Sequence, residues 1–243
     1  MKLAIFGINE LSNAIAHAAC GSGIDCTVYD TPGKISGCDA VIINTPEELD
    51  ARRRLACEID AQTEMNCVIA LTSTLSYISG MAQAVRRYPN RVLGLRFMGP
   101  SYVDKYAEIT KSFDSDDFSF KKMRSLLSQF CGNVVQAPDV IGGIFYRLLP
   151  IQANMAAYLV SEGVTPEDVD NSLIYGTNTK RAPLHIADEI GLDILLAMLE
   201  RIFDETGRPA YRPCPLLRRL VSAGRLGKKS GIGFFDYRTG GNI

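Results

Sequence analysis

The first thirty residues constrain the fold most, because a strand, a turn, a helix and a second strand follow one another directly. Residues 2–6 form a short apolar run that ends at Gly7, and a helical pattern follows as far as Gly21. A second apolar run at residues 26–29 ends at Asp30. A strand, helix and strand in this order form the opening unit of a parallel, doubly wound sheet.

Strands and helices continue to alternate as far as about residue 141, and only helices are expected after it. We expect further strands at residues 40–43, 67–71, 92–97 and 133–136, and helices at 50–61, 78–86 and 120–132. From about Gly142 only helical patterns remain, at 145–163, 165–176, 184–206 and 215–223. The sequence therefore predicts an α/β chain: a Rossmann-type doubly wound parallel sheet in residues 1–141, then an all-helical C-terminal domain in 142–243.

Composition excludes several classes of partner. The 26 Lys and Arg residues nearly balance the 27 Asp and Glu residues, so no overall positive field attracts nucleic acid or an anionic membrane. The seven cysteines form no CxxC pair, which argues against a zinc site and a disulfide framework and favours reduced thiols. Without a signal-like N-terminus or an apolar run of membrane-span length, a soluble cytoplasmic protein is expected.

The first strand-to-helix turn is where a Rossmann-type sheet holds a dinucleotide pyrophosphate. Compared with G-x-G-x-x-G, the turn keeps only its first glycine, and Asn9 and Ser12 replace the other two. Asn tolerates left-handed backbone and Ser is small, so the turn can still form. The candidate cofactor-binding residues are Gly7, Asn9, Leu11, Ser12 and Asp30, with Asp30 placed to bind ribose hydroxyls and select NAD over NADP. Weak NAD binding and a purely structural turn both remain open.

Two C-terminal segments carry a family resemblance. Residues 183–193 read Pro-Leu-His-Ile-Ala-Asp-Glu-Ile-Gly-Leu-Asp, and residues 211–237 contain Gly-Lys-Lys-Ser-Gly-Ile-Gly-Phe-Phe-Asp-Tyr. Both resemble the L-3-hydroxyacyl-CoA dehydrogenase family, although their glycines and aspartates would also suit turns and helix ends. The resemblance covers nearly the whole chain. It implies a Rossmann domain, a helical domain that carries a dimer interface, NAD as cofactor, an acyl or acyl-CoA ligand, and a role in fatty acid metabolism.

The resemblance also implies a catalytic site, which this chain has altered. The family's catalytic histidine lies in a His-Phe-x-Asn-Pro segment, matched here by Arg-Phe-Met-Gly-Pro from Arg96 to Pro100. Arginine stays protonated, so Arg96 can bind an anion but cannot accept the hydroxyl proton. The family's orienting glutamate matches Glu108, and we expect it to form an ion pair with Arg96.

Of the other positions of the family site, some keep the family's residue type and some do not. Ser73, together with Thr72, matches a segment that presents hydroxyls to substrate, while the family's asparagine before Arg-Leu-Leu has become Tyr146. Neither histidine of the chain, His17 or His185, matches the missing base; we expect His17 at the surface or on the sheet and His185 near a helix start. Loss of a positioned general base typically costs about 10² to 10⁴ in rate.

The segment after the second strand is short. Family members insert a helical hairpin there that grips coenzyme A, whereas here only residues 31–37 separate Asp30 from the next strand near Asp39. This argues against acyl-CoA binding independently of Arg96. The candidate functions are therefore a weak or altered NAD-dependent dehydrogenase, with a substrate such as an acid held by Arg96, a non-catalytic paralogue (a pseudoenzyme), or a ligand sensor. A homodimer or a heterodimer with a homologous subunit is expected, because residues 184–199 are apolar on more than one helical face.

Overall fold

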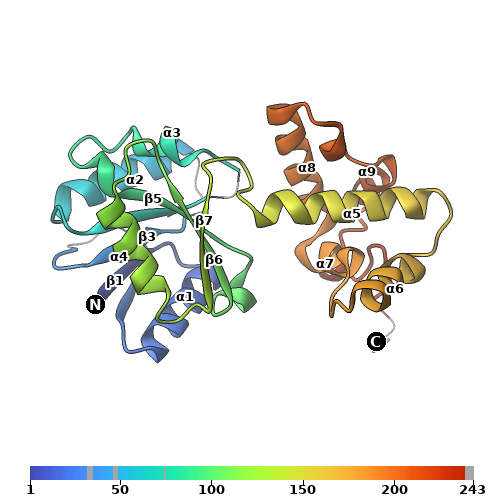
Figure 1. The fold of residues 1–243 in the computed structure, drawn as a ribbon, viewed down its shortest axis with the longest axis horizontal. Helices are drawn as coiled ribbons and strands as arrows, with labels where there is room; N and C mark the ends of the chain where they lie inside the picture. Colours follow the sequence, from blue (N-terminus) through green and yellow to red (C-terminus); the bar gives the residue numbers. More distant parts are fainter. Residues whose placement is uncertain (32–34, 46–48, 74, 239–243) are drawn as a thin grey trace. The chain divides into compact units, whose positions relative to one another are not determined.

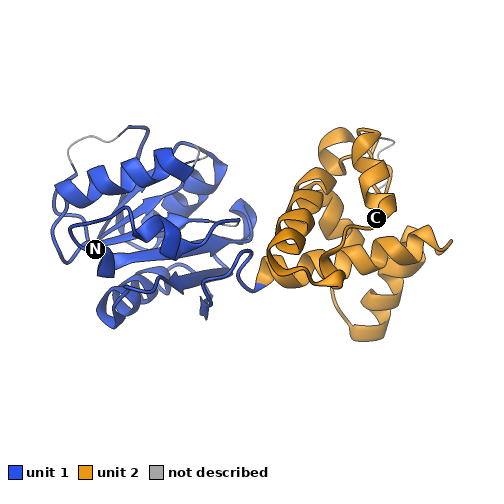
Figure 2. Cartoon of the chain, turned by 90° about the horizontal axis from the view of Figure 1, so that it is seen from above, with its two compact units in different colours: residues 1–144 blue, residues 145–243 orange. Residues whose placement is uncertain are grey.

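The computed structural model describes residues 1–31, 35–45, 49–73 and 75–238. The chain divides into two compact units, residues 1–144 and 145–243, shown in different colours in Figure 2. The division falls where the first helix of the second unit begins, close to the boundary at 141/142 predicted from the sequence. Each unit has its own elements and its own buried core, and each is described by itself.

The first unit contains one seven-stranded sheet (Figure 1). Its strands are β1 (Lys2–Phe6), β2 (Asp25–Tyr29), β3 (Ala40–Ile43), β4 (Val68–Thr72), β5 (Val92–Phe97), β6 (Tyr106–Lys111) and β7 (Asn133–Ala137). They lie in the order β2-β1-β3-β4-β5-β6-β7. The strands from β2 to β5 pair in parallel, and β3 and β4 are buried along almost their whole length, as expected for strands covered on both faces. The predicted Rossmann-type sheet is confirmed.

Strand β6 corrects the sequence prediction, which has no element in this segment. It pairs antiparallel to β5, while β7 pairs parallel to β6, so the sheet is parallel in its first five strands and reverses direction afterwards. The reversal follows from a short connection: only residues 98–105, with a 3-10 turn at Pro100–Tyr102, join β5 to β6. A parallel pair needs a crossover of a dozen or more residues, which this connection does not provide.

Helices cover both faces of the sheet. They are α1 (Glu10–Gly21), α2 (Leu49–Gln62), α3 (Ile78–Ala82) and α4 (Asp117–Leu127). Helices α1 and α4 pack in one apolar cluster, and α2 and α3 pack in another on the opposite face. Helix α3 is shorter than the predicted 78–86, because Ala84 and Val85 bond back to carbonyls three residues earlier and form tight turns instead.

The second unit is helical, as predicted. Its helices are α5 (Phe145–Ser161), α6 (Pro166–Thr177), α7 (Pro183–Ile190), α8 (Leu192–Thr206) and α9 (Pro215–Ser222). The single helix predicted over 184–206 is wrong: Gly191 has φ of +105°, which no α-helix contains, and Leu192 N–H bonds to Leu226 O instead. No helix within the described residues is both long enough and apolar enough for a membrane span.

The break at Gly191 also changes where apolar surface lies. Most apolar side chains of α7 and α8 are buried within the unit, namely Leu184, Ala187, Leu192, Leu195, Met198 and Leu199. Ile194 on α8 is nevertheless 43% exposed, so part of the apolar surface of residues 184–199 stays open in the single chain, as expected. Further exposed apolar side chains lie on α5, where Leu148 is 59%, Met155 60% and Leu159 39% exposed.

Candidate active site

The carboxyl ends of the parallel strands meet at one edge of the sheet, where open α/β sheets bind their ligands. Gly7 follows β1, Asn44 follows β3, and Thr72 ends β4 at this edge. The β5–β6 pair brings Arg96 and Glu108 to the same edge, because β6 starts where β5 ends. Most of the predicted site residues therefore share one edge of the first unit.

Asn44 organises the turn after β1. Its Nδ2 donates to Asn9 Oδ1 at 2.9 Å and to Ser12 Oγ at 2.9 Å, and its Oδ1 accepts from Thr72 Oγ1 at 2.8 Å. Asn9 Nδ2 in turn donates to Asn44 O at 2.8 Å. Ser12 is fully buried and Asn44 is 9% exposed, so these bonds satisfy polar groups that water does not reach. The side chains of Asn9 and Ser12 are thus held by one asparagine.

Asn9 is also the N-cap of α1. Its Oδ1 accepts from Ser12 N at 3.0 Å, so the carboxamide occupies one of the free N–H donors at the start of the helix. A phosphate at this helix terminus would use the same kind of donor. Gly7 allows the turn itself, since a Cβ there would lie 2.3 Å from Asn44 O. The turn keeps the shape of a nucleotide loop but has fewer open donors.

The other two candidate cofactor-binding residues, Asp30 and Leu11, differ in exposure. Asp30 is exposed immediately after β2, which leaves its carboxylate open to a ribose. Leu11 is partly buried and packs against the apolar cluster under α1, so it supports the helix and offers no polar group. The predicted absence of a hairpin concerns residues 31–37, of which 32–34 lie outside the described residues.

Arg52 adds a positive charge that the sequence patterns do not single out. From α2 its guanidinium donates to Thr72 O and to Thr72 Oγ1, the latter at 3.0 Å, and reaches Ile43 O at 3.4 Å. It therefore binds the carboxyl ends of β3 and β4 next to Asn44. Two features of the sequence could have pointed to Asn44 and Arg52. Asn44 is a polar residue directly after the apolar run 40–43, and Arg52 is an arginine in the helix that follows.

Arg96 and Glu108 face each other in the β5–β6 register and are 3% and 1% exposed. The Arg96 guanidinium donates to Thr110 Oγ1 at 2.7 Å and to Val140 O at 3.1 Å, and its buried Nε has no hydrogen-bond partner. Glu108 accepts from Tyr106 Oη at 3.1 Å and from Ile144 N at 3.1 Å. The hydrogen bonds of the arginine thus go to Thr110 and Val140, while its attraction to Glu108 acts across the strand pair.

The electrostatics agree with this geometry. Burial lowers the pKa of Arg96, and the attraction of Glu108 acts in the opposite direction. Burial, followed by the charge of Glu108, raises the pKa of Tyr106 to about 12, so this phenol stays protonated and donates to the carboxylate. Arginine keeps its proton in proteins even when buried. Arg96 is therefore a permanent cation enclosed by protein, with no capacity to accept a proton.

The other two predicted catalytic residues, Ser73 and Tyr146, lie in different units. Ser73 lies beside β5 through Ser73 N donating to Leu95 O, but its hydroxyl closes a local turn with Ser76 O at 3.0 Å. Tyr146 belongs to the second unit, where it is buried on α5 and packs edge-on against Phe145. His17 is exposed on α1, and His185 lies in the first turn of α7, as expected from the sequence.

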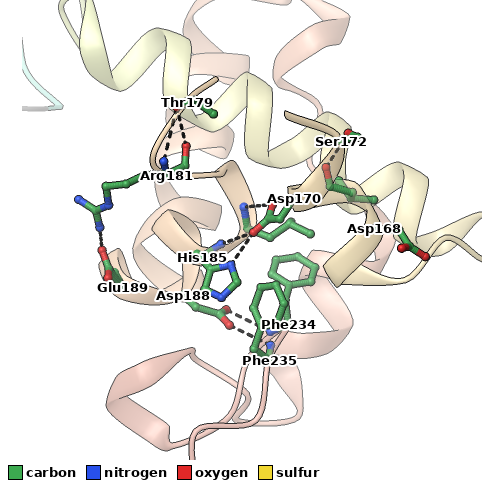
Figure 3. A network of polar contacts seen from close by, with 12 residues as sticks. Asp168, Asp170, Ser172, Thr179, Arg181, His185, Asp188, Glu189, Phe234 and Phe235 are labelled. Atoms are coloured by element: carbon green, nitrogen blue, oxygen red, sulfur yellow. Dashed lines mark hydrogen bonds and ion pairs between the residues drawn. The ribbon is translucent and has the colours of Figure 1, made fainter. Parts of the chain in front are cut away.

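The C-terminal motifs make structural contacts (Figure 3). The buried carboxylate of Asp170 accepts from the backbone N–H groups of Leu184 and His185 and contacts His185 Nδ1 at 2.7 Å, which caps α7 from the neighbouring helix α6. Asp188 accepts from the N–H groups of Phe234 and Phe235 at 3.1 and 3.0 Å. Asp170 thus ties α6 to α7, and Asp188 holds the closing segment against α7.

Two family models match the chain over most of its length. The C-terminal domain of 3-hydroxyacyl-CoA dehydrogenases matches residues 142–237, and the NAD-binding domain of the same enzymes matches residues 25–140. The second match begins at β2, so the altered turn from Gly7 to Ser12 lies before it.

Individual relatives agree. The chain is 36% identical over 200 residues to a probable 3-hydroxybutyryl-CoA dehydrogenase of Bacillus subtilis, covering 82% of the chain and 69% of the relative. It is 26% identical to the 3-hydroxybutyryl-CoA dehydrogenase of Bradyrhizobium diazoefficiens, covering 98% of the chain and 95% of the relative. That alignment extends over 280 positions against 243 residues here, so the relative contains segments that this chain lacks.

Solved structures show the same fold. The crystal structure of FadB2 from M. tuberculosis has a TM-score of 0.88 and 27% identity, covering 97% of this chain and 98% of that one. The (S)-3-hydroxybutyryl-CoA dehydrogenase PaaH1 from Ralstonia eutropha has a TM-score of 0.90 at 24% identity, covering 98% of this chain and 99% of that one. The two domain matches and the full-length relatives establish that this chain belongs to the 3-hydroxyacyl-CoA dehydrogenase family.

Proposed function

We propose that this chain is an NAD-binding oxidoreductase of the 3-hydroxyacyl-CoA dehydrogenase type whose catalytic step is slow. The observation that carries the proposal is the state of Arg96, a buried cation bonded to Thr110 and Val140 at the position of the family's proton-accepting histidine. Without a positioned base the reaction loses a factor of about 10² to 10⁴ in rate. The chain still has the sheet, the nucleotide turn and Glu108, so we propose the same class of reaction. The rate is lower because Arg96 cannot act as the base.

The residues at the carboxyl edge fit a dinucleotide in part. The backbone from Gly7 and the N-terminus of α1 would hold the pyrophosphate, and exposed Asp30 would bind the ribose hydroxyls and disfavour a 2′-phosphate. Bound NAD would supply the hydride acceptor. Asn9 weakens this site because its carboxamide already accepts from Ser12 N. We therefore expect weak binding that favours NADH over NADPH.

The substrate class follows from the relatives named 3-hydroxybutyryl-CoA dehydrogenase, which suggest a short 3-hydroxyacyl thioester. A free acid held by Arg96 is disfavoured, because two of its donors are taken up by Thr110 Oγ1 and Val140 O and the side chain is 3% exposed. Glu108 is likewise occupied by Tyr106 and Ile144. Among the described residues, neither Arg96 nor Glu108 is therefore available as a free base.

The test restores the family residues. Arg96→His combined with Tyr146→Asn should raise NADH formation from 3-hydroxybutyryl-CoA at least about tenfold above the wild-type background, because a group with a neutral-range pKa replaces the cation. Arg96→Lys, which keeps a cation, serves as the matched control and should stay at the background. Efficient turnover by the wild-type protein would contradict the proposal, and so would a folded, NADH-binding double variant with no gain.

A second candidate function, a non-catalytic subunit of a homologous dehydrogenase, is favoured by one separate observation. Leu148, Met155 and Leu159 are exposed apolar residues on α5 at spacings of seven and four, which places them along one face of the helix. Monomers rarely leave such a stripe uncovered. We propose that this face forms a dimer contact, with a second copy of the chain or with a related subunit.

A further inference from the structure

A pocket lies on the first unit, on the face of the sheet covered by α2 and α3. Its volume is about 660 Å³, and its walls come from α2 and from the turns that follow α3. The lining residues are Arg53, Arg54, Cys57, Glu58, Asp60, Ala61, Gln83, Ala84, Arg86 and Arg87. None of them is a residue of the candidate active site, and a cavity of this volume is in the range of small-molecule sites.

Internal bonds tie the two walls of this pocket together. Arg53 on α2 donates to Gly80 O at 3.0 Å, and Arg87 beyond α3 donates to Ala61 O at 3.3 Å. Between them Cys57 Sγ donates to Ala84 O at 2.8 Å. These three contacts each cross from one wall to the other. The pocket is therefore a built feature of the α2–α3 layer.

The other two arginines are not used by the fold. Arg54 and Arg86 are exposed, and within the described part of the chain neither makes a hydrogen bond or an ion pair. They stand on opposite walls, Arg54 on α2 and Arg86 after α3, and the charge of Arg86 acts on the Cys57 thiol between them. Two cations thus line the pocket, one on each wall, and no described residue uses their donors.

Acidic neighbours compensate for only part of this charge. Asp60 is buried and committed to Arg91, which it contacts at 2.6 Å, and it also accepts from Arg87 N at 3.2 Å. Asp50 pairs with Arg53 at 3.0 Å. Glu58 is the remaining carboxylate of the lining. The pocket therefore keeps an excess of positive charge in a chain whose formal net charge is -1.

We propose that this pocket binds a small organic bisphosphate. Guanidinium groups bind phosphoryl oxygens through paired N–H donors, and two free guanidiniums on opposite walls suit two separate phosphoryl groups. The lining residues Cys57, Ala61 and Ala84 offer apolar contact to the carbon skeleton between the phosphoryl groups. The nucleotide turn at Gly7 contributes no residue to this pocket, so the ligand binds independently of NAD.

Isothermal titration of the full chain with fructose 1,6-bisphosphate as the probe tests the proposal. We expect saturable binding that is tighter than that of inorganic phosphate, and no binding of fructose. Arg54→Ser combined with Arg86→Ser should weaken binding by about tenfold or more, as expected when charged hydrogen bonds are removed. NADH binding should be unchanged in this double variant, which separates the pocket from the nucleotide turn.

Arg124→Ser is the matched control, because Arg124 is an exposed arginine on α4, which packs against the opposite face of the sheet. It should leave binding of the bisphosphate unchanged. The proposal is overturned if the probe does not bind, if inorganic phosphate binds equally well, or if Arg124→Ser weakens binding as much as the double variant. Equal thermal melting of all variants would show that the differences do not arise from unfolding.

Discussion

Arg96 and Glu108 place two opposite charges where water does not reach. Each has hydrogen bonds of its own, to Thr110 and Val140 on one side and to Tyr106 and Ile144 on the other. Their attraction across the strand pair offsets part of the cost of burying them. Removal of either side chain therefore leaves the other as a buried charge without its counterpart.

We predict that Arg96→Met lowers the free energy of unfolding by about 3–5 kcal/mol, since an uncompensated carboxylate remains in the interior. Adding Glu108→Gln should recover part of that loss, because the orphaned charge is then gone. Urea denaturation of the two single variants and the double variant gives the coupling energy between the sites. Strictly additive losses would mean that the two charges do not interact.

A further prediction at this scale concerns the nucleotide turn. Asn9→Gly should bind NADH more tightly, by a factor of about ten, because the released Ser12 N–H becomes available to a phosphate. Calorimetric titration with NADH measures the change. Asn9→Ser keeps an N-cap side chain and should behave like the wild type. Unchanged affinity in Asn9→Gly would show that the carboxamide does not limit the site.

The sequence predicted part of the site at residue level. Arg96, Glu108 and the turn at Gly7 are predicted site residues that lie in or beside motifs with a known spacing, and they stay predictions. Asn44 and Arg52 were not predicted, since their importance comes from contacts with residues up to 35 positions away in the chain. Side-chain direction in such a network depends on tertiary packing, which a linear pattern does not record.

At the scale of the elements, β6 is a strand that the sequence pattern did not predict. Ala107 and Ile109 are its clearly apolar residues, while Tyr106, Glu108 and Thr110 alternate with them. Glu108 and Thr110 are nevertheless buried, because Arg96 and the segment after β7 provide their partners. The long apolar runs of β3 and β4 had no such ambiguity and were predicted closely.

Helix α4 provides a prediction at the scale of an element. Its N-cap, Asp116, accepts from Ser119 N at 2.7 Å and from Asn90 Nδ2 at 2.6 Å. Burial alone would raise the pKa of Asp116, but these hydrogen bonds outweigh it and hold the pKa below the ordinary value of 3.8. The folded state therefore favours the ionised carboxylate, and its contribution to stability is present above pH 3.8 and is lost as the pH falls through the folded pKa.

We expect Asp116→Ala to lower the free energy of unfolding by about 1 kcal/mol at neutral pH, the usual cost of losing an N-cap. The difference from wild type should shrink as the pH falls below about 4. Asp116→Asn keeps a cap acceptor and should cost less at neutral pH. Thermal melts from acidic to neutral pH measure all three proteins; a difference that grows as the pH falls would contradict this expectation.

For the whole molecule, the α5 stripe predicts self-association or association with a relative. Leu148→Glu and Met155→Glu should each convert the dimer to monomer, because a charge would be buried in the contact. Tyr175→Glu, at a residue of the same unit that is 83% exposed, is the control and should leave the dimer intact. Light scattering over a range of concentrations reports the state. A wild-type protein that stays monomeric and captures no homologous subunit would refute this assembly.

The Asn44 network also bears on how this chain could change over evolutionary time. Replacing Asn9 or Ser12 by the family's glycine removes a partner from a buried amide, and each such loss costs about 1–3 kcal/mol. The two reversions are therefore not independent steps, and neither is neutral while Asn44 remains. A chain that carries this asparagine therefore meets a stability barrier on the way to a glycine-rich turn, whereas a chain without Asn44 would not lose these two hydrogen bonds.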